Sequence, residues 1–578
     1  MVHTKDDALK LKVMAHLSVI YPNEDIPALA SQLIHAMALD EDCIKPNSHG
    51  NRWDETDIWM ITYGDSIRSD DHKPLVSLSN FMHKHLSGLM NGVHILPFFP
   101  YSSDDGFSVI DFSQVNQSLG DWNDIKSIAD DFHLMSDLVV NHCSSRSRWF
   151  ENFKQCKDPG KDYFISVPDD YDIKDVVRPR TSPLLREVNT AEGKKKVWCT
   201  FSHDQVDLNY ENPELLHEMV KTIKLYLDNG VRIFRLDAVA FLWKQSGSRC
   251  IHLPQTHEMV RLFRTLIEHH CDDAIIITET NVPNHENLSY LGNANEAHAV
   301  YNFSLPPLLI HSLISGQCQH LKDWLTAMPV SQMGTFYFNF IASHDGIGLR
   351  PAEGLLDTDE INQMVNCMKS FGGRISWRST DDGLDKPYEM NITLYDALQG
   401  TLSGPDKWHL QRFMCAHGVM LALEGVPAIY IHSLLGTQNY HQGVEHTNHN
   451  RTINRFKWDE GELEAQLSNG SHHQMVFEAM KGLIEIRRGQ ACFHPNAEQF
   501  VLHLSDEIFG FWRQSIDRQE QIFCLFNVSD KVAPLALSTL NLPNEGPWLD
   551  LISGRTFDDI YGHIELQPYE FIWLKQQS

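Results

Sequence analysis

Eight short apolar runs recur between residues 57 and 432, and stretches with helical periodicity separate most of them. Each run has the length of a β-strand, and several are rich in β-branched residues. Strands that alternate with helices predict an α/β fold with a parallel sheet, and eight such units predict a closed (β/α)8 TIM barrel. The runs are DIWMITY from Asp57, GVHILPF from Gly92, HLMSDLVVNH from His133, RIFRLDAV from Arg232, AIIITET from Ala274, AHAVYNFS from Ala297, FYFNFIASHD from Phe336 and PAIYIH from Pro427.

Two of the intervals between runs are much longer than one helix requires. Residues 143–231 separate the third and fourth runs, and residues 346–426 separate the seventh and eighth. Part of the first interval is helical, because PELLHEMVKTIKLYLDNG from Pro213 ends in the stop signal Asn229-Gly230. Both intervals follow the carboxyl end of a strand, the face where barrel enzymes carry their active sites. We therefore expect insertions there that form binding loops or small lids.

The two ends of the chain have patterns of their own. Apolar residues recur at helical spacing from Ile26 to Met37, so we expect residues 1–56 to be a helical extension that packs on the barrel rather than binding a partner. Beyond residue 488 the runs FVLHLS, EIFGFWRQ, QIFCLFNVS and EFIWLKQ are short and separated by turns. They predict a C-terminal antiparallel β domain over residues 489–578. The barrel with its insertions then covers residues 57–488.

Composition and charge narrow the possible partners. Hydrophobic residues make up 42% and charged residues 21% of the 578 residues, which is ordinary for a globular protein with a large core. The net charge of −28 disfavours nucleic acid and anionic membranes as partners. No run of about 18 apolar residues is present, so no segment is expected to span a membrane.

The cysteines bear on the compartment. The 11 cysteines contain no CxxC pair, and the first residues lack the apolar run of a signal peptide. We expect reduced thiols in a cytoplasmic protein.

Polar residues interrupt the apolar runs at their carboxyl ends. In the middle of a parallel sheet a charged side chain is costly unless it is paired. A structural ion pair is the alternative explanation for any one of these positions, but successive strand ends with the same feature favour an active site. The residues are Asn141 and His142 after the third run, Arg235 and Asp237 on the fourth, Glu279 after the fifth, and His344 and Asp345 after the seventh.

Three carboxylates at the mouth of a barrel suit the chemistry of glycosides. A retaining enzyme needs one carboxylate as nucleophile and one carboxylic acid to protonate the leaving oxygen, at a separation of about 5–5.5 Å. Arg235 lies two residues before Asp237, on the same side of the strand, where it can hold Asp237 ionised. Glu279 needs a raised pKa to act as the acid near neutral pH.

The segment DLVVNH from Asp137, the segment RLDAV from Arg235, Glu279 and the pair His344-Asp345 resemble, in order and spacing, the four signatures of the α-amylase superfamily. The resemblance covers roughly residues 57–578. It implies that Asp237 is the nucleophile, Glu279 the acid/base and Asp345 the stabiliser of the transition state. It also implies that His142, Arg235 and His344 bind glucose.

Further segments are similar to the sucrose-phosphorylase-like branch of that superfamily: GVHILPFFP, YNFSLPPLLIHSL, ASHDGIGLR and the RPR of residues 178–180. This resemblance implies that Asp104 and Arg451 hold the far glucose hydroxyls. It implies that Phe107 forms an apolar wall and that Phe201 and Gln205 flank the site. Core packing is the alternative for the two phenylalanines, and a surface salt bridge is the alternative for Arg451.

A phosphorylase admits phosphate instead of water to the glucosyl-enzyme, which requires positive charge beside the anomeric carbon. Arg178 and Arg180 are the candidates, with Arg180 favoured; the alternative is a solvated pair on a loop. The substrates are then a small glucoside and inorganic phosphate. We predict no required metal and no cofactor, because Asn141 of the third run is not accompanied by an Asp-rich ligand pattern.

The second product, the acceptor of the reverse reaction, is less constrained. Val177 replaces the aromatic residue usual in sucrose phosphorylases, whereas TSPLL after RPR and the segment PYEMN resemble glucosylglycerate phosphorylases. Glycerate is therefore expected, and Arg374, Arg378 or Lys386 is a candidate partner for its carboxylate. A solvent-exposed position without a ligand is the favoured alternative for each of the three. Fructose, fructose 6-phosphate and glycerol stay open as acceptors.

Two other hypotheses concern the activity itself. They are a hydrolase or transglucosylase on the same scaffold, and a non-catalytic binding subunit. The second is disfavoured because all three carboxylates are present. The sequence does not decide between a monomer and a homodimer.

Overall fold

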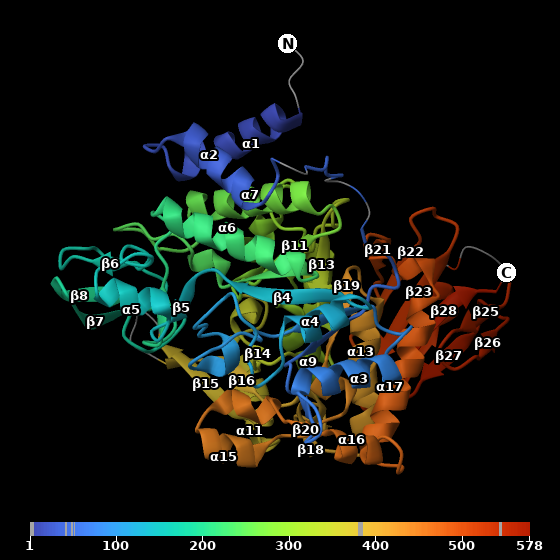
Figure 1. Ribbon diagram of the computed structural model, residues 1–578. Helices are drawn as coiled ribbons and strands as arrows, with labels where there is room; N and C mark the ends of the chain where they lie inside the picture. Colours follow the sequence, from blue (N-terminus) through green and yellow to red (C-terminus); the bar gives the residue numbers. More distant parts are fainter. Residues whose placement is uncertain are drawn as a thin grey trace.

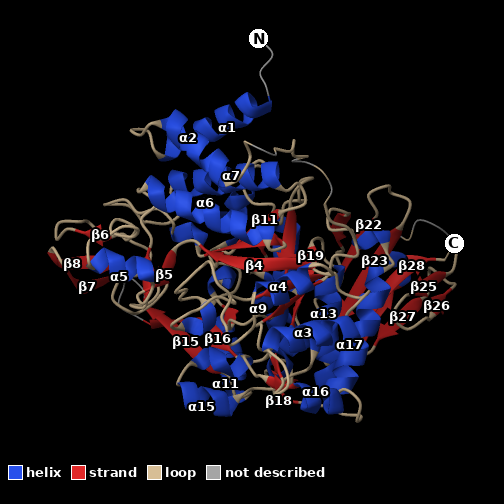
Figure 2. Ribbon diagram, in the orientation of Figure 1, coloured by secondary structure: helices blue, strands red, loops and turns tan. Residues whose placement is uncertain are grey.

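The computed structural model of the protein describes residues 5–40, 43–47, 50, 52–379, 385–540, 542 and 546–577. The eight predicted strands form a closed parallel barrel in which each strand lies beside the next one along the chain, which confirms the predicted fold (Figures 1 and 2). The strands are β1 (Trp59–Thr62), β3 (Gly92–Ile95), β4 (His133–Val139), β10 (Val231–Asp237), β11 (Ile275–Thr278), β12 (Ala299–Tyr301), β13 (Phe336–Asn339) and β19 (Val426–Tyr430).

Helices cover the outside of the barrel, so its strands are buried on both faces. All four residues of β1 and all four of β13 are buried, which explains why the runs are continuously apolar instead of alternating. The main barrel helices are α3 (Pro74–His85), α4 (Trp122–Ala129), α6 (Pro213–Asp228), α7 (Pro254–His270), α9 (Leu305–Ser315), α10 (Gln319–Ala327), α13 (His409–Ala422) and α17 (His472–Arg488).

Local signals set the two ends of α6. The Asn212 side chain accepts a hydrogen bond from the backbone N–H of Glu214, and Pro213 occupies the first turn, where no backbone donor is needed. The helix ends before Asn229, and Gly230 follows with a φ of 91°. The predicted stop signal is therefore confirmed.

The N-terminal segment is helical only in its first part. Helices α1 (Lys5–Ile20) and α2 (Ile26–Ala36) lie against α7 and α6, at the top of Figure 1. The described residues between 43 and 58 contain no helix, so the expectation of helix up to residue 56 was wrong for that part. The segment from Asp40 to Trp53 is rich in Pro, Asn, Asp and Gly, which favour turns over helix.

The two insertions add small sheets near the mouth of the barrel, while α6 and α13 at their far ends belong to the barrel. In the first insertion, β5 (His142–Ser144) pairs with β9 (Gln205–Asp207), and β6 (Ser166–Val167), β8 (Gly193–Trp198) and β7 (Leu185–Thr190) form a second sheet. In the second, β14 (Ile347–Gly348), β16 (Asp385–Asn391) and β15 (Arg374–Ser379) form a sheet beside α11 (Thr358–Ser370). Residues 380–384 of the proposed acceptor segment lie outside the described residues.

The C-terminal region is antiparallel, as predicted. A six-stranded sheet has the order β21-β22-β23-β28-β25-β26, and β24 pairs with β27 (red in Figure 1). Trp548 and Trp573 are fully buried in this region. The strands are β21 (Glu498–Val501), β22 (Ile508–Gln514), β23 (Gln521–Asn527), β24 (Ala533–Ala536), β25 (Trp548–Asp550), β26 (Thr556–Phe557), β27 (His563–Leu566) and β28 (Phe571–Gln576).

Two general features complete the fold. None of the 11 cysteines, all of which lie in the described ranges, takes part in a disulfide bond. Over the part of the chain that the structure describes, no helix has both the length and the apolar character needed to cross a membrane.

Candidate active site

A pocket opens where the carboxyl ends of β10 and β11 meet the two insertions. Twelve residues that the sequence analysis assigned to catalysis or substrate binding line this pocket. These residues are far apart in the sequence but close in space, because the carboxyl ends of all the parallel strands lie at one face of the barrel. The twelve residues are Asp104, Phe107, His142, Arg180, Phe201, Gln205, Arg235, Asp237, Glu279, His344, Asp345 and Arg451.

Arg235 is the central cation of the pocket. Strand β10 pairs with β4 so that Arg235 lies directly opposite Asp137, and its Nη1 donates to the carboxylates of Asp137 and Asp237. The contact to Asp237 Oδ1 is 2.8 Å, while Nη2 lies 3.9 Å from Oε1 of Glu279. The guanidinium is also within 5.5 Å of the ring centre of Phe107. This bonding holds Arg235 in one place between the two neighbouring carboxyl groups.

The electrostatics of Asp237 and Glu279 favour one shared proton. Burial raises the pKa of both groups to about 7, and Arg235 opposes that effect. Asp237 therefore titrates near neutrality, whereas the sequence led us to expect Arg235 to keep it ionised; loss of hydration outweighs the ion pair. Because only Asp237 bonds closely to Arg235, a single proton in the pair resides on Glu279.

The backbone after Asp237 helps to place Glu279. Ala238 adopts a left-handed conformation with a φ of 52°, which is unusual for a residue with a side chain. Its N–H donates a hydrogen bond of 3.2 Å to Oε2 of Glu279. The strained backbone that follows Asp237 therefore also fixes the position of the Glu279 carboxyl group.

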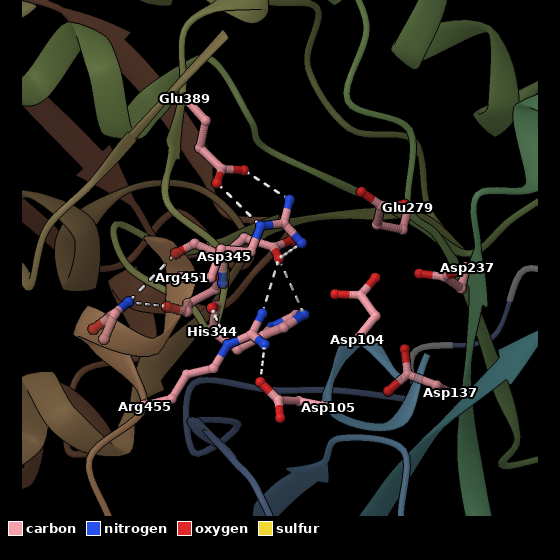
Figure 3. Close-up of polar contacts among 12 residues, drawn as sticks. Asp104, Asp105, Asp137, Asp237, Glu279, His344, Asp345, Glu389, Arg451 and Arg455 are labelled. Atoms are coloured by element: carbon pink, nitrogen blue, oxygen red, sulfur yellow. Dashed lines mark hydrogen bonds and ion pairs between the residues drawn. The ribbon is translucent and has the colours of Figure 1, made fainter. Parts of the chain in front are cut away.

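Asp345 lies among cations on the opposite side of the pocket (Figure 3). Its Oδ1 is 2.5 Å from Nη1 of Arg451 and 3.7 Å from Nη2 of Arg455. Burial favours the neutral acid, but Arg451, His344 and Arg455 outweigh it and hold the pKa of Asp345 well below its ordinary value. Asp345 is therefore ionised at neutral pH, unlike Glu279.

Arg451 and Arg455 are fixed by carboxylates outside the predicted set. Arg451 donates to both oxygens of the buried Glu389, over 3.0 and 2.8 Å. Arg455 Nη1 bonds to Asp105, which follows Asp104 in a tight turn. Figure 3 shows these links beside Asp345. The alternative of a surface salt bridge for Arg451 is wrong, because its partner Glu389 is only 1% exposed.

The remaining polar residues form a second wall. His142 Nε2 lies 3.0 Å from the carbonyl oxygen of Phe107 and 3.2 Å from Nε2 of Gln205, which also donates to Asp104. The Phe107 ring stacks on His344, with ring centres 5.0 Å apart. Burial lowers the pKa of His344 to about 3, so its ring is neutral and can both donate and accept a hydrogen bond.

The two arginines of the RPR segment lie in different places. Arg180 lines the pocket, where its guanidinium lies 5.9 Å from the ring centre of Phe201 and 5.2 Å from that of Tyr388. Arg178 is exposed and donates to the carbonyl oxygen of Ser182. Of the pair, only Arg180 is placed to meet a ligand.

Known proteins resemble this chain in sequence and in structure. The family model for the alpha amylase catalytic domain matches residues 84–349. Glucosylglycerate phosphorylase of Spirochaeta thermophila is 44% identical over 532 residues, 90% of each chain. That of Allomeiothermus silvanus is 39% identical over 98% of each chain. The crystal structure of sucrose 6F-phosphate phosphorylase from Thermoanaerobacter thermosaccharolyticum superposes with a TM-score of 0.71 at 26% identity, covering 82% of this chain and 94% of its own.

The chain belongs to the α-amylase family, among its glycoside phosphorylases.

Some members of the α-amylase family use calcium, with the Asn of the third strand as a ligand, but here a lysine lies at that Asn. Lys244 Nζ is buried, 2.9 Å from Oδ1 of Asn141 and 2.6 Å from Oδ2 of Asp207. The ammonium group of Lys244 forms an ion pair with Asp207 and donates a hydrogen bond to the amide oxygen of Asn141. These residues do not fit a metal ion.

The basic residues proposed for the acceptor lie outside the pocket of this α-amylase family member. Arg374 and Lys386 are exposed, and Arg378 pairs with Glu353 at 2.6 Å. None of the three is among the residues that line the pocket, so that prediction is not supported. Their strands, β15 and β16, carry side chains to both faces of the small sheet, and only contacts made in three dimensions decide which face meets the pocket.

Several residues were missed at the sequence level: Asn281, Arg350 and Tyr388 line the pocket, and the others lie next to it. Arg350 ends the segment ASHDGIGLR, and Tyr388 and Glu389 lie in PYEMN, so the segments were noticed but not these side chains. Asp137 begins the DLVVNH segment, and the sequence could have indicated its role, because a charged residue on a buried strand requires a partner. The residues missed are Asp105, Asp137, Asn281, Arg350, Tyr388, Glu389 and Arg455.

Proposed function

We propose that this chain is a retaining glycoside phosphorylase that cleaves an α-glucoside of glycerate with inorganic phosphate and releases α-glucose 1-phosphate. The observation that carries the proposal is the unequal pair of buried carboxyl groups, Asp237 bonded to Arg235 and Glu279 not. One ionised and one protonated carboxyl group on neighbouring strands are what a retaining mechanism requires. The likeness to glucosylglycerate phosphorylases supports the choice of substrate.

In the first half-reaction the Asp237 carboxylate attacks the anomeric carbon. The bond between that carbon and the glycerate oxygen breaks, and Glu279 delivers its proton to the departing oxygen. The product is a glucosyl ester of Asp237. Asp345, which its arginine neighbours hold ionised, stabilises the positive charge that develops on the sugar ring.

In the second half-reaction a phosphate oxygen attacks the same carbon and the ester bond to Asp237 breaks. Glu279, now ionised, accepts the proton of the phosphate, which returns both carboxyl groups to their starting state. Two inversions give overall retention. Arg180 is the proposed partner of phosphate, because it lines the pocket and no carboxylate among the described residues pairs with it.

Glucose is proposed to lie between the carboxyl pair of Asp237 and Glu279 and the wall that contains His142 and Phe107. Arg235 holds the nucleophile, and the stacked Phe107 supplies an apolar surface for the sugar. The polar groups proposed to bind its hydroxyls are Asp104, His142, Gln205, His344 and Arg451, with Phe201 at the edge. The 11 cysteines, none of them in a disulfide bond within the described ranges, support a cytoplasmic location.

The test is synthesis from α-glucose 1-phosphate with glycerate, glycerol, fructose and fructose 6-phosphate, measured as phosphate release. Glycerate is expected to be the best acceptor, and cleavage of glucosylglycerate is expected to require phosphate. A clear preference for fructose or its phosphate would contradict glycerate as the acceptor but not the phosphorylase activity. Cleavage that proceeds equally without phosphate would replace the phosphorylase with a hydrolase.

A further inference from the structure

Four arginines line the pocket, and they fall into two classes. Arg235 and Arg451 are bound by carboxylates of the protein itself. Arg180 and Arg350 make no ion pair and no side-chain hydrogen bond with any residue that the structure describes. The guanidinium of Arg180 lies over two aromatic rings, those of Phe201 and Tyr388. Both are half-buried, so their charge is only partly hydrated. Two cations without a counter-ion in the described part of the chain favour an anionic ligand, even in a protein with a net charge of −28.

Arg350 lies on the side of the pocket where the leaving group departs. It opens the short helix η4 (Arg350–Ala352) directly after β14. Gly348 of β14 packs so closely on Asn281 that an added Cβ would lie 3.1 Å from its Nδ2. Asn281 follows Glu279 by two residues, and Glu279 protonates the departing oxygen in the proposed mechanism. The segment that carries Arg350 therefore borders the aglycone, away from the glucose wall of His142 and Gln205.

A backbone hydrogen bond places Arg350 beside the residue that faces Arg180. The N–H of Leu349 donates to the carbonyl oxygen of Tyr388 at 3.0 Å, and the ring of Tyr388 lies under the guanidinium of Arg180. Arg180 and the segment of Arg350 thus both adjoin Tyr388, and all three residues line one pocket. An acceptor beside Glu279 has a cation within reach from each insertion, Arg180 from the first and Arg350 from the second.

Asn281 adds a neutral acceptor to this region. It lines the pocket, and its buried Oδ1 has no hydrogen-bond partner among the described residues. A buried carbonyl oxygen without a donor is costly, and a hydroxyl group of a ligand would satisfy it. The same region thus offers cations for a carboxylate and an amide oxygen for a hydroxyl, which are the functional groups of a small hydroxy acid.

We propose that Arg350 determines acceptor specificity by binding the carboxylate of the acceptor, and that with Arg180 it binds phosphate in the second half-reaction. The inference rests on the proposed function. In a retaining mechanism the aglycone leaves and phosphate enters on the same face of the sugar, so both anions meet the same cations in turn. The planar guanidinium fork suits carboxylate and phosphate oxygens alike.

The experiment compares glycerate with the neutral acceptor glycerol in synthesis from α-glucose 1-phosphate. For Arg350→Gln the ratio of kcat/KM for glycerate to that for glycerol is expected to fall by about ten- to a hundredfold, the value of a charge-assisted hydrogen bond. The half-saturating phosphate concentration in cleavage is expected to rise as well. Arg350→Lys keeps the charge but loses the fork, so its ratio should fall between those of wild type and Arg350→Gln.

Arg378→Gln is the matched control, because Arg378 lies in the same insertion but pairs with Glu353 outside the pocket. It should keep the wild-type ratio. A wild-type ratio in Arg350→Gln overturns the inference, and an unchanged half-saturating phosphate concentration overturns the shared site. If Arg350→Gln does not fold, a wild-type ratio in Arg350→Lys has the same meaning. A wild-type enzyme that does not prefer glycerate to glycerol would instead contradict the proposed function.

Discussion

Single residues in the pocket differ in protonation because their neighbours differ. Asp237 and Glu279 share a desolvated region in which ionising both is costly, and burial raises the pKa of each to about 7. Asp345, a short distance away, is ionised because Arg451 and Arg455 surround it. Three carboxyl groups of one pocket therefore have three different tasks, and the position of the arginines assigns them.

The first prediction at this scale concerns the nucleophile. Asp237→Asn should lose nearly all glucosyl transfer, by about a thousandfold or more, because an amide cannot form the covalent ester. The measurement is release of the leaving group from an activated α-glucoside, with circular dichroism as the test of folding. A folded variant with wild-type turnover would contradict the role assigned to Asp237.

A second prediction at this scale concerns pH and stability. The pKa of Glu279 rises from 4.5 to about 7 on folding, so the folded state holds a proton that the unfolded state releases between these values. The contribution of Glu279 to stability is thus fully present below about pH 4.5 and is lost as pH rises toward 7. Glu279→Gln has no ionisable group to lose this proton. Its free energy of unfolding relative to that of the wild type should therefore increase by on the order of 2–3 kcal/mol from pH 5 to pH 8.

Urea midpoints of the wild type and of Glu279→Gln at pH 5 and pH 8 provide the measurement. The advantage of the variant should be larger at pH 8. The same advantage at both values would mean that Glu279 has an ordinary pKa in the folded protein.

At the scale of elements, a strained turn between β3 and α4 brings Asp104 and Phe107 to the pocket. The short helix η1 (Asp104–Gly106) contains Asp104 and Asp105 at φ angles of 54° and 45°, and Gly106 at 116°. A Cβ on Gly106 would lie 2.7 Å from the carbonyl oxygen of Pro97. Glycine is therefore required by both conformation and space.

Gly106→Ala should displace this turn and lower kcat/KM by about tenfold or more, since strain of this kind costs about 1–3 kcal/mol. Gly193→Ala is the matched control: its φ is 117°, yet nothing lies within 4 Å of an added Cβ, and it belongs to the β7–β8 turn. Both variants should lose stability, but only Gly106→Ala should lose activity with an activated α-glucoside. Equal activity of the two variants would show that the turn does not position the site.

At the scale of the whole molecule, accessory parts cover the barrel without reaching the pocket. Helices α1 and α2 lie on α7 and α6, and Leu17 of α1 is fully buried whereas Leu11 is 55% exposed. The C-terminal sheet lies at another side of the barrel (Figure 1). The accessory parts therefore stabilise the fold, whereas the two insertions supply residues of the pocket.

Leu17→Ala should lower the free energy of unfolding by about 2–5 kcal/mol, the usual cost of removing a buried leucine. Leu11→Ala on the same helix should change it by less than about 0.5 kcal/mol, because that side chain is exposed. Thermal midpoints of both variants provide the measurement, together with kcat/KM of the folded proteins. Equal midpoints would contradict the docking of α1 on the barrel.

The sequence by itself determined the barrel and the positions of its principal site residues. Period and length mark the eight strands, and parallel strands place Asp237, Glu279 and Asp345 on one face whatever the loops do. The caps of α6 are equally local. These features depend on residues close together in the chain, or on the topology that their order dictates.

Only the tertiary structure decided which charges neutralise one another. Arg455 and Asp105 are 350 residues apart, and Arg451 meets Glu389 from 62 residues away. Neither pairing follows from a local pattern, so the ionised state of Asp345 was not predictable. The lack of a counter-ion at Arg350 among the described residues was not predictable either. The raised pKa of Asp237 likewise depends on burial, which the chain acquires only when insertions and barrel close around it.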